Sequence, residues 1–139
     1  MSTLKRKKQT SNKKVKNATP TVYNNIKFRS KLEMYTYKKL EQAKINAEYE
    51  MHRFELIPAF VFLGKKIRAM TYLPDFVGDN FIIECKGFGN DAWPLREKLF
   101  KYKLFLTNDN RQFYVVHNQK EVDECINQIL TNNEGNSNQ

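Results

Sequence analysis

The stretch YLPDFVGDNFIIECKG, residues 72–87, decides the expected fold. It holds the end of one strand, expected over Ile67–Val77, and the whole of the next strand, Phe81–Lys86. The residues between them, Gly-Asp-Asn at 78–80, are typical of a tight turn. The two strands are therefore expected to lie side by side in one sheet.

Two acids and a lysine stand at the ends of these strands. Side chains alternate between the two faces of a strand, so Glu84 and Lys86 project to the same side. Asp75 lies at the end of the preceding strand, and the short turn can bring it next to Glu84. Two carboxylates about 5 Å apart repel by roughly 3 kcal/mol at an effective dielectric of 20. Protonation of one carboxyl or a divalent cation can offset this repulsion, and hard oxygen ligands suit Mg²⁺ or Mn²⁺.

The flanking sequence predicts an α/β sandwich. Apolar residues recur at helical spacing from Ser30 to about Asn46, and strand-favouring residues fill 48–63, where Pro58 divides the run or places it at an edge. A turn is expected at 64–66, a helix at 92–106, a strand at 112–117 and a closing helix at 122–130. The strand–helix–strand connection allows the third and fourth strands to be parallel.

The composition bounds the class of protein. A chain of 139 residues with 40% hydrophobic residues can form one domain with a buried core. No apolar run approaches the roughly 18 residues of a membrane span. Cys85 and Cys125 cannot form a disulfide framework and lack the spacing of a zinc site. We expect a basic disordered tail at 1–19, a folded domain at 20–131 and a polar tail at 132–139.

The net charge of +9 is concentrated near the N-terminus. Residues 1–16 contain no acid and seven basic residues: Lys5, Arg6, Lys7, Lys8, Lys13, Lys14 and Lys16. Nucleic acid is the expected partner of such a segment, while an anionic membrane surface or a solubility or targeting role are alternatives. Two further basic groups are candidate phosphate contacts or solvated surfaces: Lys65, Lys66 and Arg68, and then Arg96, Lys98, Lys101 and Lys103.

The blocks Tyr72–Val77 and Ile82–Gly87, together with the helix that bears Glu33, resemble the PD-(D/E)XK nuclease superfamily. Four flanking segments, 28–33, 54–60, 64–66 and 96–100, resemble a family of small phage proteins within that superfamily. The similarity covers about residues 22–106, and size and layout are similar to the phage endonuclease I type of Holliday-junction resolvase. The resemblance implies a restriction-endonuclease-like core, in which helices flank a central mixed sheet of four to five strands in αβββαβ order.

The resemblance also implies roles for individual residues. Asp75 and Glu84 match metal-binding carboxylates, the Cys85 backbone carbonyl matches a main-chain ligand, and Lys86 matches the motif lysine. Glu33 matches an acid that reaches the metal through water or binds a second metal. Glu33 also has capping-box spacing from Ser30, so it is either a site acid or a helix cap.

The implied activity is Mg²⁺-dependent hydrolysis of DNA, with Mn²⁺ as a substitute, that leaves 5′-phosphate and 3′-hydroxyl ends. The expected role is resolution of branched DNA by a phage protein in the host cytoplasm. Symmetric cutting of a junction would favour a homodimer. The alternatives are another phage endonuclease, nicking or restriction-like, and a non-catalytic nucleic-acid-binding module. In that module Asp75 and Glu84 would be ordinary turn and surface acids.

Overall fold

The apolar run after the Gly-Asp-Asn turn forms β9 (Phe81–Cys85), the central strand of the domain. The structure, a computed structural model, describes residues 21–87 and 92–137. Strand β9 pairs antiparallel with β8 (Phe76–Val77) and parallel with β10 (Gln112–Val116). Strand β3 (Glu48–Tyr49) completes a four-stranded mixed sheet in the order β10-β9-β8-β3. The pairing of the two neighbouring strands predicted from the sequence is confirmed, and the parallel pair that the helical connection allowed is present.

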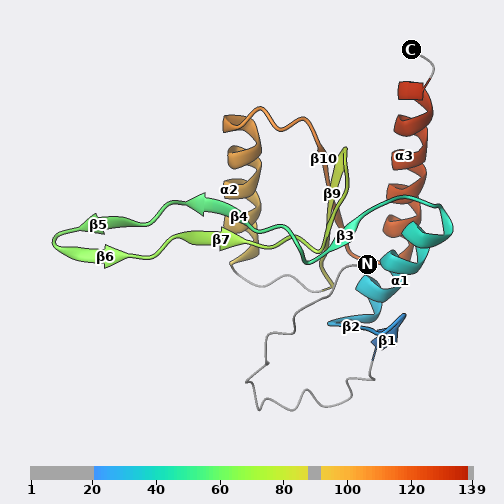
Figure 1. The fold of residues 1–139 in the computed structure, drawn as a ribbon, viewed down its shortest axis with the longest axis horizontal. Helices are drawn as coiled ribbons and strands as arrows, with labels where there is room; N and C mark the ends of the chain where they lie inside the picture. The colour runs from blue at the N-terminus through green and yellow to red at the C-terminus, as the bar shows by residue number, and fades with distance from the viewer. Residues whose placement is uncertain (1–20, 88–91, 138–139) are drawn as a thin grey trace.

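Helices cover both faces of this sheet (Figure 1). Alternate β9 side chains enter two cores, because successive residues point to opposite faces. Ile83 packs in the core that includes residues of α1 (Lys31–Gln42) and α3 (Gln119–Ser137). Ile82 packs in the other core, with residues of α2 (Trp93–Leu106). Both isoleucines are 0% exposed, so the strand that leads to Glu84 is held from two sides.

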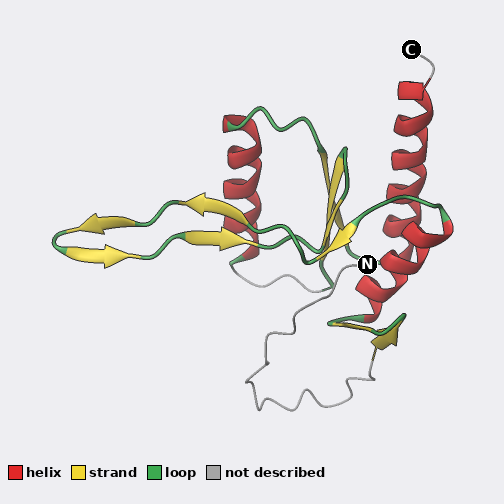
Figure 2. Ribbon diagram, viewed as in Figure 1, coloured by secondary structure: helices red, strands yellow, loops and turns green. Residues whose placement is uncertain are grey.

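Residues 54–72 form a narrow two-stranded ribbon that projects from the body (Figures 1 and 2). We call this segment the ribbon arm. At its base β4 (Phe54–Ile57) pairs with β7 (Met70–Tyr72), and at its tip β5 (Phe60–Phe62) pairs with β6 (Lys65–Ile67).

The long strands expected over 48–63 and 67–77 are therefore each broken into short ones. Pro58 separates β4 from β5, because proline cannot donate to a strand ladder. Pro74 lies in the gap between β7 and β8. The expected turn at 64–66 is shifted to residues 63–64, and Lys65 and Lys66 belong to β6.

Two terminal elements differ from the sequence prediction. The N-terminal hairpin of β1 (Thr21–Tyr23) and β2 (Ile26–Phe28) was not expected; its turn is made by Asn24 and Asn25 at φ 53° and 61°. Helix α3 continues to Ser137, through residues expected to form a polar tail. An Asn80–Asn133 hydrogen bond of 2.8 Å fixes this last part against the sheet turn.

Neither cysteine forms a disulfide, as the composition indicated. Among the described residues, the three helices are too short or too polar to cross a membrane. The predicted basic tail at 1–19 lies outside the described residues, as do its candidate DNA contacts: Lys5, Arg6, Lys7, Lys8, Lys13 and Lys14.

Candidate functional site

Four acidic side chains from different elements gather where β9 ends: Glu33, Glu50, Asp75 and Glu84. Asp75 directly precedes β8, and its Oδ2 accepts a 2.7 Å hydrogen bond from the Cys85 backbone N–H. Ligand oxygens of Glu33, Glu50 and Asp75 lie within 4.8 Å of one another. Asp75 and Glu84 are 8% and 6% exposed. The strand pair predicted from the sequence therefore does bring Asp75 beside Glu84.

Glu33 serves as part of a helix cap and also faces the other acids. Its backbone N–H donates to Ser30 Oγ at 3.1 Å, and the Ser30 hydroxyl donates to Glu33 Oε2 at 2.7 Å. The other carboxylate oxygen accepts from the Tyr49 hydroxyl at 3.0 Å. The sequence left open whether Glu33 is a helix cap or a site acid, and its position in the structure allows both.

Glu84 and Lys86 share one face of the sheet, as the alternation predicted. The Tyr72 hydroxyl donates to Glu84 Oε2 at 2.6 Å, and Lys86 Nζ lies 3.6 Å from the other oxygen. Lys86 Nζ also stands 4.6 Å from the centre of the Trp93 ring. These contacts fix the direction of both side chains before any substrate binds.

Burial and mutual repulsion make the ionised carboxylates costly. Burial, followed by the nearby Glu84 and Glu33, raises the pKa of Asp75 to about 9, although the Cys85 N–H opposes the shift. Burial also raises the pKa of Glu84 against the opposing effects of Tyr72 and Lys86. The pKa of Glu50 is raised by burial while Arg29, 3.1 Å away, lowers it. Without a cation, the site retains protons to higher pH than ordinary carboxyls do.

Residues 12–122 match the model of a family described as a protein of unknown function (DUF1064). The chain belongs to this family. Comparisons with curated proteins and with solved structures give no match. The matched part of this DUF1064 protein includes all four acids and Lys86.

The DUF1064 site has the donors that a hard divalent cation prefers. Carboxylate oxygens converge from α1, from the residue after β3 and from the residue before β8. Burial, together with the neighbouring Glu84 and Glu33, raises the pKa of Asp75, so a cation would favour its ionised form. An open cleft of about 660 Å³ is lined by three of the acids, Glu50, Asp75 and Glu84. Residues that line the cleft beside the acids are Arg29, Arg53, Thr71, Lys86, Trp93 and Arg96. This arrangement can bind a cation and an anionic substrate side by side.

Glu50 was missed by the sequence prediction. It lies outside the 72–87 stretch, immediately after the two-residue strand β3, and no local motif marks it. Its backbone N–H donates to the Asp75 carbonyl at 2.9 Å, which places its side chain at the cluster. Its φ of 49° is unusual for a residue with a side chain. Glu50 is placed in the cluster by a backbone contact between residues distant in the chain, and the sequence does not reveal such a contact.

The Cys85 thiol lies on the face of β9 opposite Glu84, against α1. Its Sγ lies 3.4 Å from the Thr36 hydroxyl, and burial raises its pKa. The thiol is therefore a packing group. The role of the Cys85 backbone carbonyl as a metal ligand stays a prediction.

The predicted phosphate-binding residues are dispersed. Arg96 lines the cleft, where its Nη1 donates to the Thr71 carbonyl at 2.9 Å. Lys98 is exposed on α2, and Lys101 pairs with Glu97 at 3.1 Å. The exposed group Lys65, Lys66 and Arg68 lies far along the ribbon arm. Sequence reasoning missed Arg53, which donates to Thr71 Oγ1 at 3.0 Å beside the acids.

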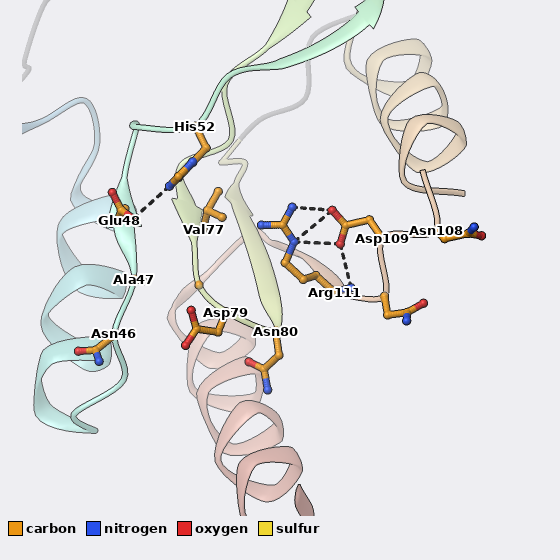
Figure 3. A pocket seen from close by; sticks show the side chains of 12 residues that line it. Asn46, Ala47, Glu48, His52, Val77, Asp79, Asn80, Asn108, Asp109 and Arg111 are labelled. Carbon is orange, nitrogen blue, oxygen red and sulfur yellow. Dashed lines mark hydrogen bonds and ion pairs between the residues drawn. The ribbon is translucent and has the colours of Figure 1, made fainter. Parts of the chain in front are cut away.

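A second hollow lies at the opposite end of β9, near the turn that precedes it (Figure 3). Several of its polar side chains are paired with each other. His52 lies 3.1 Å from Glu48, and Arg111 binds Asp109 through several contacts. His52 is thus a surface partner of an acid. The acid cluster is the stronger candidate for chemistry.

Proposed function

We propose that this protein is a Mg²⁺-dependent DNA endonuclease with a restriction-endonuclease-like core of the PD-(D/E)XK type. The observation that carries the proposal is the arrangement of Asp75, Glu84 and Lys86. They stand at the adjoining ends of two paired strands, with both acids buried and the lysine 3.6 Å from Glu84. Glu33 and Glu50 add carboxylates from two other elements.

The residues that would hold the cation are Asp75, Glu33 and Glu50, and Glu84 lies next to Asp75 in the same cluster. When bound, Mg²⁺ or Mn²⁺ supplies Lewis acidity toward a phosphoryl oxygen and lowers the pKa of a bound water. Ser30 and Tyr49 hold Glu33, the Cys85 N–H holds Asp75, and Tyr72 holds Glu84. Because these donors fix the carboxylates in advance, little reorganisation is needed when the substrate arrives.

Lys86 acts on the substrate side of the cluster. Glu84 and the Trp93 ring direct its ammonium group into the cleft. From there it can orient the attacking water or stabilise charge that develops on the phosphoryl oxygens. Arg53 and Arg96, which line the same cleft, are suited to contact the phosphates on either side of the cut bond.

Branched DNA is the proposed substrate, on the basis of the resemblance to junction resolvases. Resolution needs two cuts related by symmetry, so we propose that the active form is a homodimer. The setting that fits is phage DNA metabolism in the host cytoplasm.

Burial favours the endonuclease over a non-catalytic DNA-binding module. In the module, Asp75 and Glu84 would be ordinary turn and surface acids, yet they are 8% and 6% exposed. Burying several carboxylates together is costly, and fold stability alone would favour apolar or neutral side chains there. Binding of a catalytic cation accounts for buried carboxylates that fold stability alone would not favour.

The test is cleavage of a labelled four-way junction and a matched linear duplex, each with Mg²⁺ and with EDTA. The proteins are wild type, Asp75→Asn and the control Asp79→Asn, which alters an exposed acid in the β8–β9 turn. Paired cuts in the junction that need Mg²⁺ and Asp75, but not Asp79, would support the proposal. Equal cutting of both substrates would support the endonuclease activity but refute selectivity for branched DNA. Binding without cutting would overturn the enzymatic function.

A further inference from the structure

The tip of the ribbon arm exposes apolar side chains far from either core. Phe60, Val61, Phe62 and Leu63 are 46%, 66%, 61% and 86% exposed. In an isolated β-ribbon these residues have no packing partner across the sheet, and exposing them favours aggregation. Polar residues would suit a structural hairpin better, so the apolar tip indicates a binding role.

The strand register sorts these side chains onto two faces. Opposite residues of an antiparallel pair share a face. Phe60 pairs with Ile67 and Phe62 with Lys65, which gives one face that is largely apolar and ends in a cation. Val61 pairs with Lys66 on the other face. The ribbon therefore presents apolar groups and lysine ammonium groups together at its tip.

The turn adds an independent observation. Leu63 and Gly64 connect the paired residues 62 and 65, with φ of 47° and 76°. Such a two-residue turn with both φ values positive prefers Asn-Gly or Asp-Gly. Leucine in this backbone conformation is strained, and here it is also the most exposed of the large apolar residues in the described chain. Strain of this kind persists where a side chain has a function.

The charge of the arm points to a polyanion. No acid occurs between Glu55 and Asp75, whereas Lys65, Lys66 and Arg68 all lie in that interval and are exposed. Two copies of this arm placed tip to tip would bring like charges together. A nucleic-acid backbone offers the complementary charge, and its bases offer apolar faces.

We propose that the ribbon arm is a DNA wedge. Leu63 and Phe62 insert between base steps or into an open branch point, while Lys65, Lys66 and Arg68 hold the neighbouring phosphates. The major groove admits a two-stranded ribbon, and inserted apolar side chains unstack and kink DNA. That the polyanion is DNA rests on the proposed function.

The arm is anchored at the acid cluster. Its last residue, Tyr72, donates to Glu84, and Arg53 and Arg96 hold Thr71 beside it. From Tyr72 to Leu63 is nine residues, or about 30 Å at roughly 3.3 Å per residue. This corresponds to about nine base pairs at 3.4 Å each. The wedge would therefore mark a distorted step just under one helical turn from the cut.

The test uses 2-aminopurine placed next to the centre of a four-way junction, since its fluorescence rises when a base unstacks. All proteins carry Asp75→Asn so that binding is measured without cleavage. Leu63→Asn is the key variant, because Asn-Gly favours the same turn and preserves the fold. Leu106→Asn is the matched control, an exposed leucine at the end of α2. Sedimentation reports the oligomeric state of each protein.

We expect a fluorescence rise with the parent protein and with Leu106→Asn, and its loss with Leu63→Asn. Junction affinity should fall about tenfold in Leu63→Asn, because the burial of the leucine side chain between bases is lost. Unchanged fluorescence and affinity in that variant would overturn the wedge. A change from dimer to monomer with fluorescence intact would instead make the tip a protein interface. Wild-type cleavage is scored separately: a wedge without cleavage refutes only the proposed function, and cleavage without a wedge refutes only this inference.

Discussion

Replacement of Asp75 by asparagine should make the protein more stable without metal while it abolishes catalysis. The asparagine oxygen can still accept the Cys85 N–H that now reaches Asp75 at 2.7 Å. Its amide group can donate to Glu33, which lies within hydrogen-bonding distance of Asp75. Volume and hydrogen bonding are thus preserved, and a buried carboxyl group, which folding must either protonate or bury as a charge, is removed.

The magnitude follows from the spacing of the charges. Ligand oxygens of Glu33, Glu50 and Asp75 lie within 4.8 Å of one another, and two ionised carboxylates at that limit repel by about 3.5 kcal/mol at an effective dielectric of 20. The folded-state pKa of about 9 for Asp75 gives a larger figure, about 5 kcal/mol at pH 8 relative to an unfolded pKa near 3.9. That figure includes the whole cost of burying the charge, and burying an amide also costs free energy. We therefore expect a gain of about 3 kcal/mol, or about 10 °C in Tm.

The assay is thermal unfolding at pH 8 in EDTA and in Mg²⁺, alongside cleavage of the labelled junction. Mg²⁺ at about 100 times its Kd should stabilise wild type by about 2.7 kcal/mol and the variant by much less. The exposed Asp79→Asn change should leave both stability and cleavage at wild-type values. The variant should cut no junction under any metal condition.

Two results would refute this reasoning. If Asp75→Asn unfolds at a lower temperature than wild type in EDTA, the carboxylates do not repel as described. If Mg²⁺ stabilises the variant as strongly as wild type, the cation binds elsewhere. Either result would remove the physical basis for a metal site at Asp75.

Three further predictions concern the same cluster. Metal-free protein should lose stability as pH rises from about 5 to 9. The pKa values of Asp75, Glu50 and Glu84 are raised, so the folded state binds more protons in this range than the unfolded chain does. Urea unfolding at several pH values in EDTA measures this loss, and Mg²⁺ should make the free energy of unfolding depend less on pH. Glu50→Gln should reduce stabilisation by Mg²⁺ in thermal unfolding, whereas equal stabilisation would remove Glu50 from the metal site. Lys86→Gln should lower cleavage at least 100-fold with Mg²⁺ stabilisation retained, and single-turnover kinetics that match wild type would contradict its role.

The sequence predicted the part of the fold and site that depends on local pattern. The Gly-Asp-Asn turn fixed the pairing of β8 with β9, and strand alternation placed Glu84 and Lys86 on one face. A connection through a helix was consistent with the parallel pairing of β9 and β10. Each of these inferences concerns residues close in sequence or a well-defined rule of chain connection.

What the sequence could not predict depends on distant contacts. Glu50 joins the cluster through a backbone hydrogen bond to Asp75, 25 residues later in the chain. Helix α3 continues to Ser137 through residues whose polar composition suggested a tail, and Asn133 there accepts a hydrogen bond from the distant Asn80. The strands of the ribbon arm were expected, but their separation from the main sheet was not, because strand propensity does not specify a partner.

The two cores explain how a small domain tolerates several buried acids in one place. Asp75 directly precedes β8 and Glu84 lies in β9, and in this strand pair Phe76, Ile82 and Ile83 are at most 1% exposed. Helices on both faces therefore hold the backbone beneath the acids, and the carboxylates cannot separate without disrupting a core. On a flexible loop, repulsion between the carboxylates would move them apart. Here the rigid backbone keeps them close together. A cation relieves this repulsion when it binds. The preorganised acids bind it more tightly than the same acids on a mobile surface would, because folding has already brought the carboxylates together.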